Sequence, residues 1–288
     1  MPPLSDVLAH ARGRLRAAAG GSEGGSATPA LDAELLLGFV LGVDRATLLT
    51  HPERELTAEE VAASRSAIER RERGEPVAYI VGRKEFYGLD LRVDRRVLIP
   101  RPETETLVER ALVRLPGDGR GAVVADAGTG SGAIAIAVAR TRPGAVVYAT
   151  DVSADALTVA RENARRLVGE RRITFVHGAL LAGVPDGVDV VCANLPYIPT
   201  NDLPALGVSV RAYEPWTALD GGPDGLDVYR ALVDELPEKL APGGAVLMEC
   251  DPAQADALLE LGLAALPGTS GEILTDLAGD ARVVELRR

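Results

Sequence analysis

The sequence predicts an α/β fold in which a mostly parallel sheet follows a small all-helical domain and a β-hairpin. From about residue 108 onward, short apolar runs alternate with helical patterns, which is typical of a parallel sheet covered by helices on both faces. Before residue 77, apolar residues recur at helical spacing. Between them, aromatic residues and apolar–polar alternation indicate a hairpin. The predicted parts are residues 1–76, 77–100 and 101–288.

The first helix of residues 1–76 is expected at the N-terminus, with Ser5 as its candidate cap. Its apolar positions follow helical spacing: Leu4, Val7, Leu8, Ala11 and Leu15. The glycine- and serine-rich residues 20–26 predict a flexible connector.

A second helix is predicted to begin with Thr28 as cap and Pro29 at its first position. Its expected apolar positions are Leu31, Leu35, Leu36 and Phe39. Thr57 and Glu60 match a capping box, so a third helix is expected from there to about Arg73. No residue of these three helices suggests chemistry.

The third part, residues 101–288, is predicted as repeated strand–helix units. The expected strands are residues 122–125, 146–150, 173–176, 188–193 and 243–250. The expected helices are residues 133–140, 154–167 with Ser153 as cap, and 226–240.

Composition narrows the class of protein. The chain has 288 residues, 47% of them hydrophobic, which is enough for one large domain and a smaller one. Its longest apolar stretches, such as residues 133–139, are too short to span a bilayer. The N-terminus lacks the continuous apolar core of a secretory signal. We therefore expect a cytoplasmic protein.

The net charge and the cysteine and histidine content argue against two further classes of protein, nonspecific nucleic-acid binders and metal-binding proteins. The net charge of −11 argues against a nonspecific nucleic-acid binder, because phosphate contacts need clustered basic residues. Cys192 and Cys250 lie in apolar runs and are expected to be buried free thiols. The three histidines lack ligand spacing, so no metal site is expected.

The segment "DAGTGSGA", residues 126–133, follows a predicted strand and precedes a predicted helix. Its glycines allow a tight turn and close approach of the backbone to a ligand at the helix N-terminus. Gly128, Gly130 and Ala133 also match the dinucleotide fingerprint. No Lys-Ser/Thr pair follows, which excludes a P-loop. The turn therefore predicts a nucleotide-type ligand.

Asp151 ends the next strand, "VVYATD". A carboxylate at this edge of the sheet can accept hydrogen bonds from both hydroxyls of a ribose. Together with the glycine turn it favours an adenosine-type ligand, and both NAD and S-adenosylmethionine fit this pattern.

The segment "ANLPYIPT", residues 193–200, follows the fourth strand, at the edge where open α/β sheets bind ligands. The Asn194 side-chain oxygen and a backbone carbonyl can accept the two N–H groups of a planar nitrogen and align it for attack on a methyl group. Pro196 fixes the chain direction, and Tyr197 offers an aromatic face for the substrate group. Such an arrangement does not assist hydride transfer.

These motifs resemble class I S-adenosylmethionine-dependent methyltransferases that act on planar nitrogens. Four longer segments are similar to release-factor glutamine N5-methyltransferases of the HemK/PrmC type over about residues 74–288. They are "GEPVAYIVGRKEFYGLDLRVDRRVLIPRPETETLVERAL", "YEPWTALDGGPDGLDVYRALV" and the pair "APGGAVLMECDPAQ" and "DLAGDARVVELR".

The resemblance implies a seven-stranded Rossmann-like methyltransferase domain whose final strand is antiparallel. It implies S-adenosyl-L-methionine as cofactor and S-adenosyl-L-homocysteine as product. The cofactor would be held by residues of the glycine turn, the next strand end and the later motifs: Asp126, Gly128, Thr129, Gly130, Ser131, Gly132, Asp151, Leu180 and Asn194.

The implied substrate is the glutamine of the Gly-Gly-Gln loop in a peptide-chain release factor. Asn194 and the Pro196 carbonyl would bind its amide, with Leu195 and Tyr197 beside them. Arg101 and Glu103, in "IPRPETE", are candidate substrate contacts or capping residues of the following helix. The N-terminal helices would help to bind this partner, and no stable nucleic-acid complex, membrane association or oligomer is implied. Glu214 and Pro215 are expected to be mainly architectural.

The sequence departs from the family pattern at two positions. Leu195 stands where the family usually has a proline, and the resulting "NLPY" is also the wording of ribosomal-RNA adenine dimethyltransferases. Ala179 stands where the family commonly has an aspartate that reaches the adenine amino group, so Leu180 is left to supply an apolar wall.

Three functions remain open from the sequence. A glutamine N5-methyltransferase of a release factor is favoured by the acidic charge and the flanking motifs, and a paralogue with another protein substrate is a variant of it. An adenine-N6 methyltransferase of RNA or DNA is the second. A catalytically idle cofactor-binding module is the third, against which the intact Asn194, Pro196 and Tyr197 count.

Overall fold

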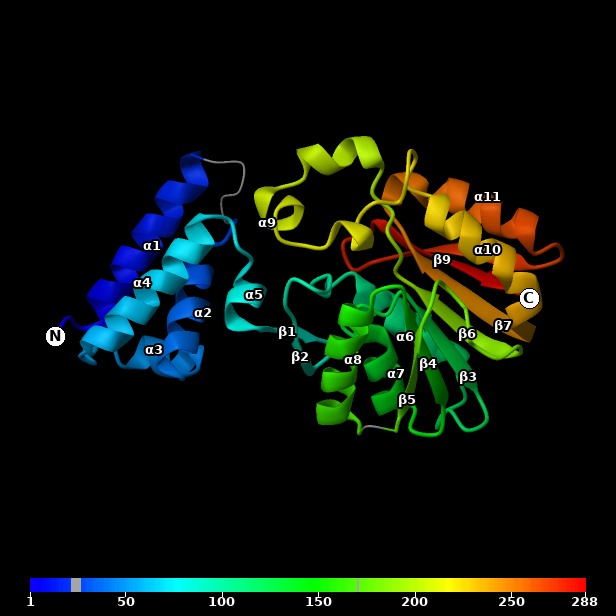
Figure 1. Ribbon diagram of the computed structural model, residues 1–288, viewed down its shortest axis with the longest axis horizontal. Coiled ribbons are helices and arrows are strands. Elements are labelled where there is room, and N and C mark those ends of the chain that lie inside the picture. The colour runs from blue at the N-terminus through cyan, green and yellow to red at the C-terminus, as the bar shows by residue number, and fades with distance from the viewer. Residues whose placement is uncertain (22–26, 170) are drawn as a thin grey trace. The chain divides into compact units, whose positions relative to one another are not determined.

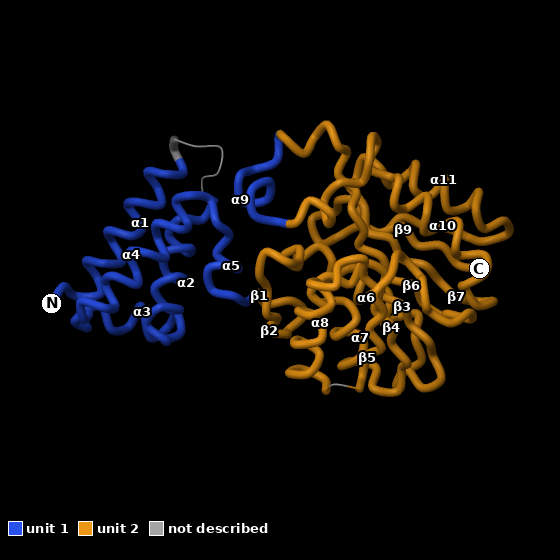
Figure 2. The backbone as a smooth tube through the Cα atoms, in the orientation of Figure 1, with its two compact units in different colours: residues 1–83, 205–214 blue, residues 84–204, 215–288 orange. Residues whose placement is uncertain are grey.

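The computed structural model describes residues 1–21, 27–169 and 171–288. Residues 22–26 of the predicted connector lie outside these ranges, whereas its first two residues end the first helix. The chain forms two compact units, which Figure 2 colours separately. Unit 1 contains residues 1–83 and 205–214, and unit 2 contains residues 84–204 and 215–288.

Unit 1 is helical, as predicted. Its helices are α1 (Leu4–Gly21), α2 (Pro29–Leu41), α3 (Arg45–Thr50), α4 (Ala58–Glu72), α5 (Val77–Val81) and α9 (Val208–Arg211). The longer ones pack around an apolar core to which α1 contributes Leu4, Leu8, Ala11 and Leu15. The capping box at the start of α4 is confirmed, because the Thr57 side chain accepts from Glu60 N–H and the Glu60 side chain accepts from Thr57 N–H.

The predicted cap of α1 is wrong. Ser5 lies inside the first turn, and α1 begins one residue before it, at Leu4. The exposed donors of this helix end are satisfied by another segment of backbone: Leu4 N–H donates to Arg54 O, and Ser5 N–H to Pro52 O. Since carbonyls remote in sequence accept these N–H groups, a side-chain cap is not required.

The apolar face of α2 also differs from the prediction. Pro29 does occupy the first position, but Ala33, Leu36 and Leu37 form its buried side. Leu35 and Phe39 are 43% and 44% exposed, as is Leu31 to a similar degree. The helix is apolar almost all round, so its sequence does not specify which side packs against the core.

Unit 2 carries the sheet. Its strands are β3 (Val123–Ala127), β4 (Val146–Asp151), β5 (Ile173–His177), β6 (Val188–Ala193), β7 (Leu240–Glu249), β8 (Ser270–Thr275) and β9 (Ala281–Arg287). Its α-helices are α6 (Thr104–Arg114), α7 (Ala133–Thr141), α8 (Ala154–Leu167), α10 (Asp227–Lys239) and α11 (Ala255–Ala265). Three 3-10 turns add η1 (Thr200–Ala205), η2 (Trp216–Ala218) and η3 (Pro252–Gln254).

The strand order is β5-β4-β3-β6-β7-β9-β8. Strands β3 to β7 pair in parallel, and β9 is antiparallel to both of its neighbours. Helices α6, α7 and α8 cover one face, whereas α10 and α11 cover the other (Figure 1). The predicted seven-stranded α/β fold with an antiparallel final strand is therefore confirmed. From β3 the chain adds strands first on one side, β4 and β5, and then on the other, β6 and β7. Such a change of direction leaves a crevice at the carboxyl ends of the strands on either side of it.

The hairpin comprises β1 (Arg83–Phe86) and β2 (Leu89–Arg92). Its two turn residues, Tyr87 and Gly88, both have positive φ, 51° and 69°, as a turn matched to the twist of a two-residue hairpin requires. The preceding residues, predicted as part of the hairpin segment, instead form the short helix α5, which ends at Gly82 in the left-handed region.

The remaining class predictions concern membranes, thiols and metals. No helix in the described ranges is both long and apolar enough to cross a membrane. Cys192 and Cys250 are buried free thiols, as predicted. Among the described residues no cluster of three potential metal ligands occurs.

Candidate active site

A cavity of about 490 Å³ opens at the carboxyl ends of β3, β4 and β6, within unit 2. Its volume lies in the usual range for small-ligand sites. Most of the predicted site residues line it: Gly128, Thr129, Gly130, Ser131, Asp151, Leu180, Asn194, Leu195 and Pro196. The sheet therefore brings together side chains that lie up to about seventy residues apart in the chain, as expected of parallel strands.

The glycine turn after β3 needs its glycines for two different reasons. Gly128, Gly130 and Gly132 all have positive φ, 72°, 54° and 84°, which is unfavourable for residues with a Cβ. A Cβ at Gly128 would also lie 2.8 Å from the Leu195 side chain. At Gly130, by contrast, the position of a Cβ is open, so the backbone there can be approached by a ligand.

Asp126 lies beneath this turn and not in the lining of the cavity. Its Oδ2 accepts hydrogen bonds from the Thr129 hydroxyl at 2.6 Å and from Ala135 N–H at 3.1 Å. Its Oδ1 has no hydrogen-bond partner in the described part of the chain. Burial raises the pKa of Asp126 to about 6. Asp126 thus ties the turn to the start of α7 from below.

Asp151 reaches the cavity from the end of β4. Gly130 N–H donates to its Oδ2 at 2.9 Å, and Ser153 N–H donates to its Oδ1 at 2.8 Å. Each carboxylate oxygen has a further lone pair. Asp151 is therefore fixed by backbone donors and can still accept hydrogen bonds from a pair of hydroxyl groups.

The wall beyond Asp151 is apolar. Val152, Ala179 and Leu180 line it. Leu180 has a positive φ of 47°, which is uncommon for a residue with a side chain. Its carbonyl accepts a hydrogen bond from the buried Thr150 hydroxyl, and this bond holds the turn. A flat apolar group such as an adenine ring fits against this surface.

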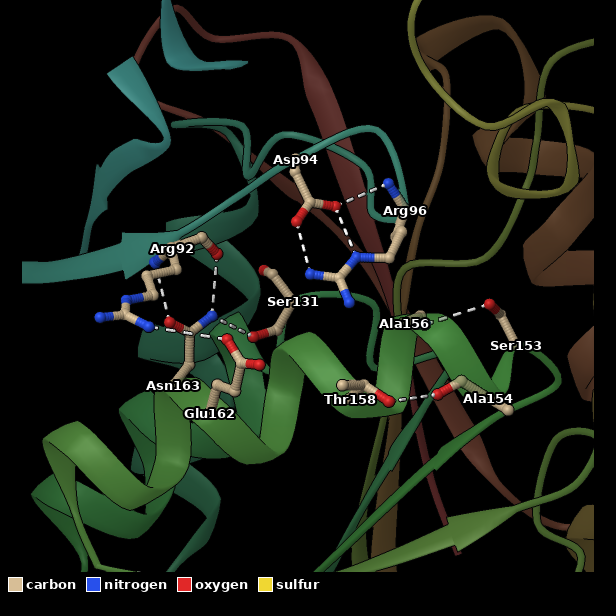
Figure 3. Close-up of polar contacts among 10 residues, drawn as sticks. All are labelled: Arg92, Asp94, Arg96, Ser131, Ser153, Ala154, Ala156, Thr158, Glu162 and Asn163. Atoms are coloured by element: carbon tan, nitrogen blue, oxygen red, sulfur yellow. Dashed lines mark hydrogen bonds and ion pairs between the residues drawn. The ribbon is translucent and has the colours of Figure 1, made fainter. Parts of the chain in front are cut away.

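Asn163 is a supporting residue that the sequence did not reveal. Its fully buried amide lies on α8 and makes three hydrogen bonds (Figure 3). Its Oδ1 accepts from Arg92 N–H at 2.8 Å, and its Nδ2 donates to Arg92 O and to Ser131 O, both at 2.9 Å. The glycine turn, the end of β2 and α8 are thereby joined at one side chain.

Asn194 and Pro196 both line the cavity, and each carries an oxygen that can accept a hydrogen bond. Asn194 Nδ2 donates to Thr104 Oγ1 at 3.0 Å, so its Oδ1 is directed away from Thr104. Neither Asn194 Oδ1 nor Pro196 O accepts a hydrogen bond from the described residues. A Cβ at Gly221 would lie 2.7 Å from Pro196 O, so a glycine is needed there.

Leu195 lies between these two residues and also lines the cavity. It is buried and contacts the glycine turn. Its N–H donates to the Tyr229 hydroxyl at 3.2 Å, and that hydroxyl in turn donates to Glu249 O. Tyr229 is wholly buried on α10. The extra N–H that a leucine brings to this position is therefore satisfied.

Tyr197 does not line the cavity. Its ring packs on the apolar core beneath α10 and α11, and its hydroxyl lies 3.5 Å from Glu249 Oε1. Burial raises the pKa of Tyr197. Its carbonyl accepts from Gln254 Nε2 at 2.8 Å, so the residue anchors the segment that carries Asn194 and Pro196.

The "IPRPETE" segment places different residues at the cavity from those predicted. Pro100 and Thr104 line it, whereas Arg101 and Glu103 do not. Glu103 is exposed at the start of α6 and makes no side-chain capping hydrogen bond. Glu214 is buried, and Pro215 lines the cavity mouth.

Several further cavity residues carried no recognisable signal of their own. Arg96 lines the cavity and is paired with Asp94 at 2.6 Å (Figure 3). Thr217 and Ala218 lie on the opposite side, in the "YEPWTALDGG" segment. Their segments were conspicuous in the sequence, but which residue of each reaches the cavity depends on turns that have no periodic pattern.

Comparison with known proteins agrees with this geometry. Residues 6–82 match a family model described as the PrmC N-terminal domain, and residues 104–203 match one described as the methyltransferase small domain. The chain is 45% identical to the release factor glutamine methyltransferase of Moorella thermoacetica over 93% of each chain. It is 41% identical to the release factor glutamine methyltransferase of Deinococcus radiodurans, over 99% of this chain and 98% of that one.

A solved structure supports the fold alone. The methyltransferase from Pyrococcus furiosus is 22% identical, with a TM-score of 0.52, and the match covers 71% of this chain and 90% of that one. At this level of identity the likeness concerns the arrangement of the sheet and its helices.

Proposed function

Because the chain belongs to the release factor glutamine methyltransferases, it is an enzyme that methylates a glutamine side-chain amide, and we propose that the cavity of unit 2 is where it does so. The observation that carries this proposal is the pair of acceptors at Asn194 Oδ1 and Pro196 O, both without a donor in the described residues. A primary amide has two N–H groups in one plane, and two acceptors two residues apart in the cavity lining can take one each.

The two acceptors act on the nucleophile. An amide nitrogen is a poor nucleophile because its lone pair is delocalised into the carbonyl. Hydrogen bonds from its N–H groups to Asn194 Oδ1 and Pro196 O direct electron density to nitrogen and hold it for in-line displacement. These bonds strengthen as positive charge develops on the nitrogen, so they stabilise the transition state more than the ground state.

The cofactor proposed for the cavity is S-adenosylmethionine, which supplies a methyl group on a positively charged sulfur. The residues present fit it. The open backbone at Gly130 accommodates its methionine part, Asp151 accepts from the ribose hydroxyls, and Val152 and Leu180 face the adenine. Asp126 supports the turn from beneath without touching the ligand.

Loss of the proton needs no dedicated base. Once the nitrogen carries the methyl group and a positive charge, its remaining protons are strongly acidic and pass readily to water. The three carboxylates of the lining already have donors: Asp151 accepts from two backbone N–H groups, Asp220 from Thr200 and Gly222, and Asp227 from Arg230.

The partner proposed for this enzyme is the release factor itself, with residues 1–76 contributing to its binding. Support comes from the surface of α2, where Leu31, Leu35 and Phe39 are spaced four residues apart and exposed. Residues three to four apart lie on one side of a helix, so these three form an apolar stripe.

The test uses radiolabelled S-adenosylmethionine with purified release factor and, separately, with RNA. Label is expected in the release factor, on its glutamine side chain, and not in RNA. Label found only in RNA would refute the proposal and favour adenine-N6 methylation.

The matched variant is Asn194→Ala. We expect it to lower kcat/KM by at least about a hundredfold, as loss of an oriented acceptor in an active site does, while S-adenosylhomocysteine still binds in calorimetry. Thr158→Ala, on the exposed side of α8, is the control and should remain active. An Asn194→Ala enzyme with full activity would remove the proposed role of this amide.

A further inference from the structure

A chain of buried polar groups lies behind Asn194, and the reaction as described makes no use of it. Asn194 Nδ2 donates to Thr104 Oγ1 at 3.0 Å. Thr104 is the first residue of α6 and is 3% exposed. Behind it, Glu249 ends β7 with 1% of its surface exposed, and the Thr104 hydroxyl lowers its pKa as a hydrogen-bond donor would.

No hydrogen bond of ordinary geometry joins Thr104 to Glu249. Glu249 Oε2 has no partner of normal geometry in the described residues, whereas Oε1 is 3.5 Å from the Tyr197 hydroxyl. Since a buried carboxylate oxygen without a donor is costly, we assign the Thr104 hydroxyl to Glu249 as its donor, in line with its lowering of the pKa of Glu249.

The polarity of this chain determines which way the Asn194 amide faces. A threonine hydroxyl has a single proton to donate. If Glu249 is ionised it can only accept, so it takes that proton, and Thr104 offers lone pairs to Asn194. Asn194 then presents its NH₂ to Thr104 and its oxygen to the cavity.

A protonated Glu249 supports the opposite arrangement. It can donate to Thr104, which can then donate its own proton to Asn194 Oδ1. The amide would turn by half a rotation and present its NH₂ to the cavity. A substrate amide arriving with two N–H groups would there meet a donor in place of an acceptor.

We propose that Thr104 and Glu249 are positioning residues that set the orientation of the Asn194 amide, with ionised Glu249 keeping its oxygen toward the cavity. This inference rests on the proposed role of Asn194 as acceptor for the glutamine amide. Neither residue touches the reacting atoms, so both act through Asn194.

The surroundings place the ionisation of Glu249 in an accessible pH range. Burial raises its pKa to about 7, against the lowering effects of Thr104, of Arg282 on β9 and of the Tyr197 hydroxyl, while Glu103 at the start of α6 raises it. The folded enzyme thus holds Glu249 neutral below about pH 7 and ionised above it. Activity that depends on ionised Glu249 must therefore rise with pH through this value.

Two other groups near Glu249 do not titrate there. Burial raises the pKa of Cys250 to about 12 and that of Tyr229 well above its usual value. The Tyr229 hydroxyl binds the backbone carbonyl of Glu249 and not its carboxyl group. A change in activity near pH 7 is therefore not a titration of these neighbours.

The kinetic test compares Thr104→Val, Thr104→Ser and Glu249→Gln with the wild type between pH 6 and 9. Thr104→Val removes the hydroxyl at nearly constant shape, and Glu249→Gln removes the charge. Both are expected to lower kcat/KM for the release factor by about tenfold or more, the worth of one oriented hydrogen bond, and to lose the rise near pH 7. Thr104→Ser should restore both.

The controls are Thr158→Val and Glu238→Gln, the same changes at exposed positions of α8 and α10. They should keep the wild-type rate and pH profile. Binding of S-adenosylhomocysteine, measured by calorimetry, should persist in all variants. Equal activity of Thr104→Val and Thr104→Ser would overturn the inference, because the hydroxyl would then be dispensable.

A second readout does not need the substrate. The side-chain NH₂ signals of Asn194 in the ¹⁵N NMR spectrum, identified by their loss in Asn194→Ala, should shift with pH in the wild type with a midpoint near 7. They should not shift in Glu249→Gln. Signals that stay constant in the wild type would overturn the inference. A wild-type enzyme that labels no release factor would instead refute the proposed function, and the NMR result would still stand.

Discussion

At the scale of single residues, Asp126 is a carboxyl group whose charged form the fold disfavours. It is fully buried, one of its oxygens has no partner among the described residues, and burial raises its pKa to about 6. The unfolded chain would release this proton near the ordinary value of 3.8. Folded and unfolded states therefore bind this proton differently between about pH 4 and 6.

Asp126→Asn should remove this difference. Because the folded state holds the proton more tightly, the wild-type free energy of unfolding falls as pH rises from about 4 to 6, by at most about 3 kcal/mol. The asparagine oxygen can still accept from Thr129 and Ala135. The stability of Asp126→Asn relative to wild type should therefore increase over this range, as urea unfolding at several pH values would measure.

The control for this change is Asp234→Asn, at an exposed position of α10. Its stability relative to wild type should vary little with pH. If Asp126→Asn behaved in the same way, Asp126 would be ionised in the folded protein throughout, and the cost assigned to its burial would be wrong.

The residues of the site that could be predicted are those whose type and spacing are themselves the signal. Glycines at 128 and 130 are needed by the backbone, Asp151 ends a strand, and Asn194 follows directly after one. Thr104 and Asn163 could not be predicted in this way. Their importance lies in partners that are 90 and 71 residues away in the sequence, and threonine and asparagine at a helix start or on a helix have many local uses.

At the scale of elements, Asn163 joins three segments through hydrogen bonds from one buried side chain. Asn163→Ala would leave Arg92 N–H and two carbonyls without partners in a buried place. We expect a loss of about 2–4 kcal/mol in the free energy of unfolding, together with weaker binding of S-adenosylhomocysteine, because the Ser131 carbonyl is released.

Urea unfolding and calorimetry measure these two effects. Thr158→Ala, on the exposed face of the same helix, provides the comparison and should change stability by less than about 1 kcal/mol. A stability of Asn163→Ala equal to that of the control would show that the hydrogen bonds of Asn163 do not hold α8 in place.

The loop between Asp220 and Asp227 supports the acceptor segment from behind. A Cβ at Gly225 would collide with the Tyr197 carbonyl and with Gln254, and its φ is +80°. Gly225→Ala should therefore displace the backbone next to Pro196 and lower kcat by about tenfold or more, as small misplacements of a catalytic group do.

Gly268→Ala separates the collision from the backbone strain. Gly268 has nearly the same φ, +85°, but open space where a Cβ would lie. It should cost about 1–2 kcal/mol of stability and leave kcat unchanged. If both variants had the same activity, contact between this loop and the acceptor segment would not matter for catalysis.

Elements were predicted well where an apolar run or stripe is clearly bounded by polar residues or turns. They were predicted poorly where apolar residues lie on all sides of a helix. Strand β6 was predicted at its observed bounds because it is an apolar run between turns. In α2, apolar residues surround the helix, so periodicity could not tell Leu36 and Leu37 from Leu35 and Phe39. The predicted cap of α1 was wrong because Pro52 and Arg54, which are remote in sequence, supply the acceptors for the first N–H groups of the helix.

At the scale of the whole molecule, the cavity belongs entirely to unit 2, whereas the apolar stripe on α2 belongs to unit 1. If residues 1–76 help to bind the release factor, changes in the stripe should act on substrate binding alone. Leu35→Gln combined with Phe39→Gln should raise KM for the release factor by about thirtyfold, since each removes an exposed apolar contact worth about 1 kcal/mol.

Steady-state kinetics on the intact release factor would measure this change, with kcat and S-adenosylhomocysteine binding expected to stay at wild-type values. Leu277→Gln, fully exposed between β8 and β9 of unit 2, is the matched control and should leave KM unaltered. An unchanged KM in the double variant would count against a role of α2 in partner binding.

The hydrogen bond between Leu195 N–H and the Tyr229 hydroxyl has a consequence for how such enzymes can diverge. With leucine at 195, a change of Tyr229 to phenylalanine leaves the buried Leu195 N–H without an acceptor, at a cost of about 1–3 kcal/mol. With proline at 195, which has no N–H, the same change leaves no donor at that position without an acceptor. The two substitutions are therefore epistatic, and the order in which a lineage acquires them decides whether it passes through an impaired ancestor.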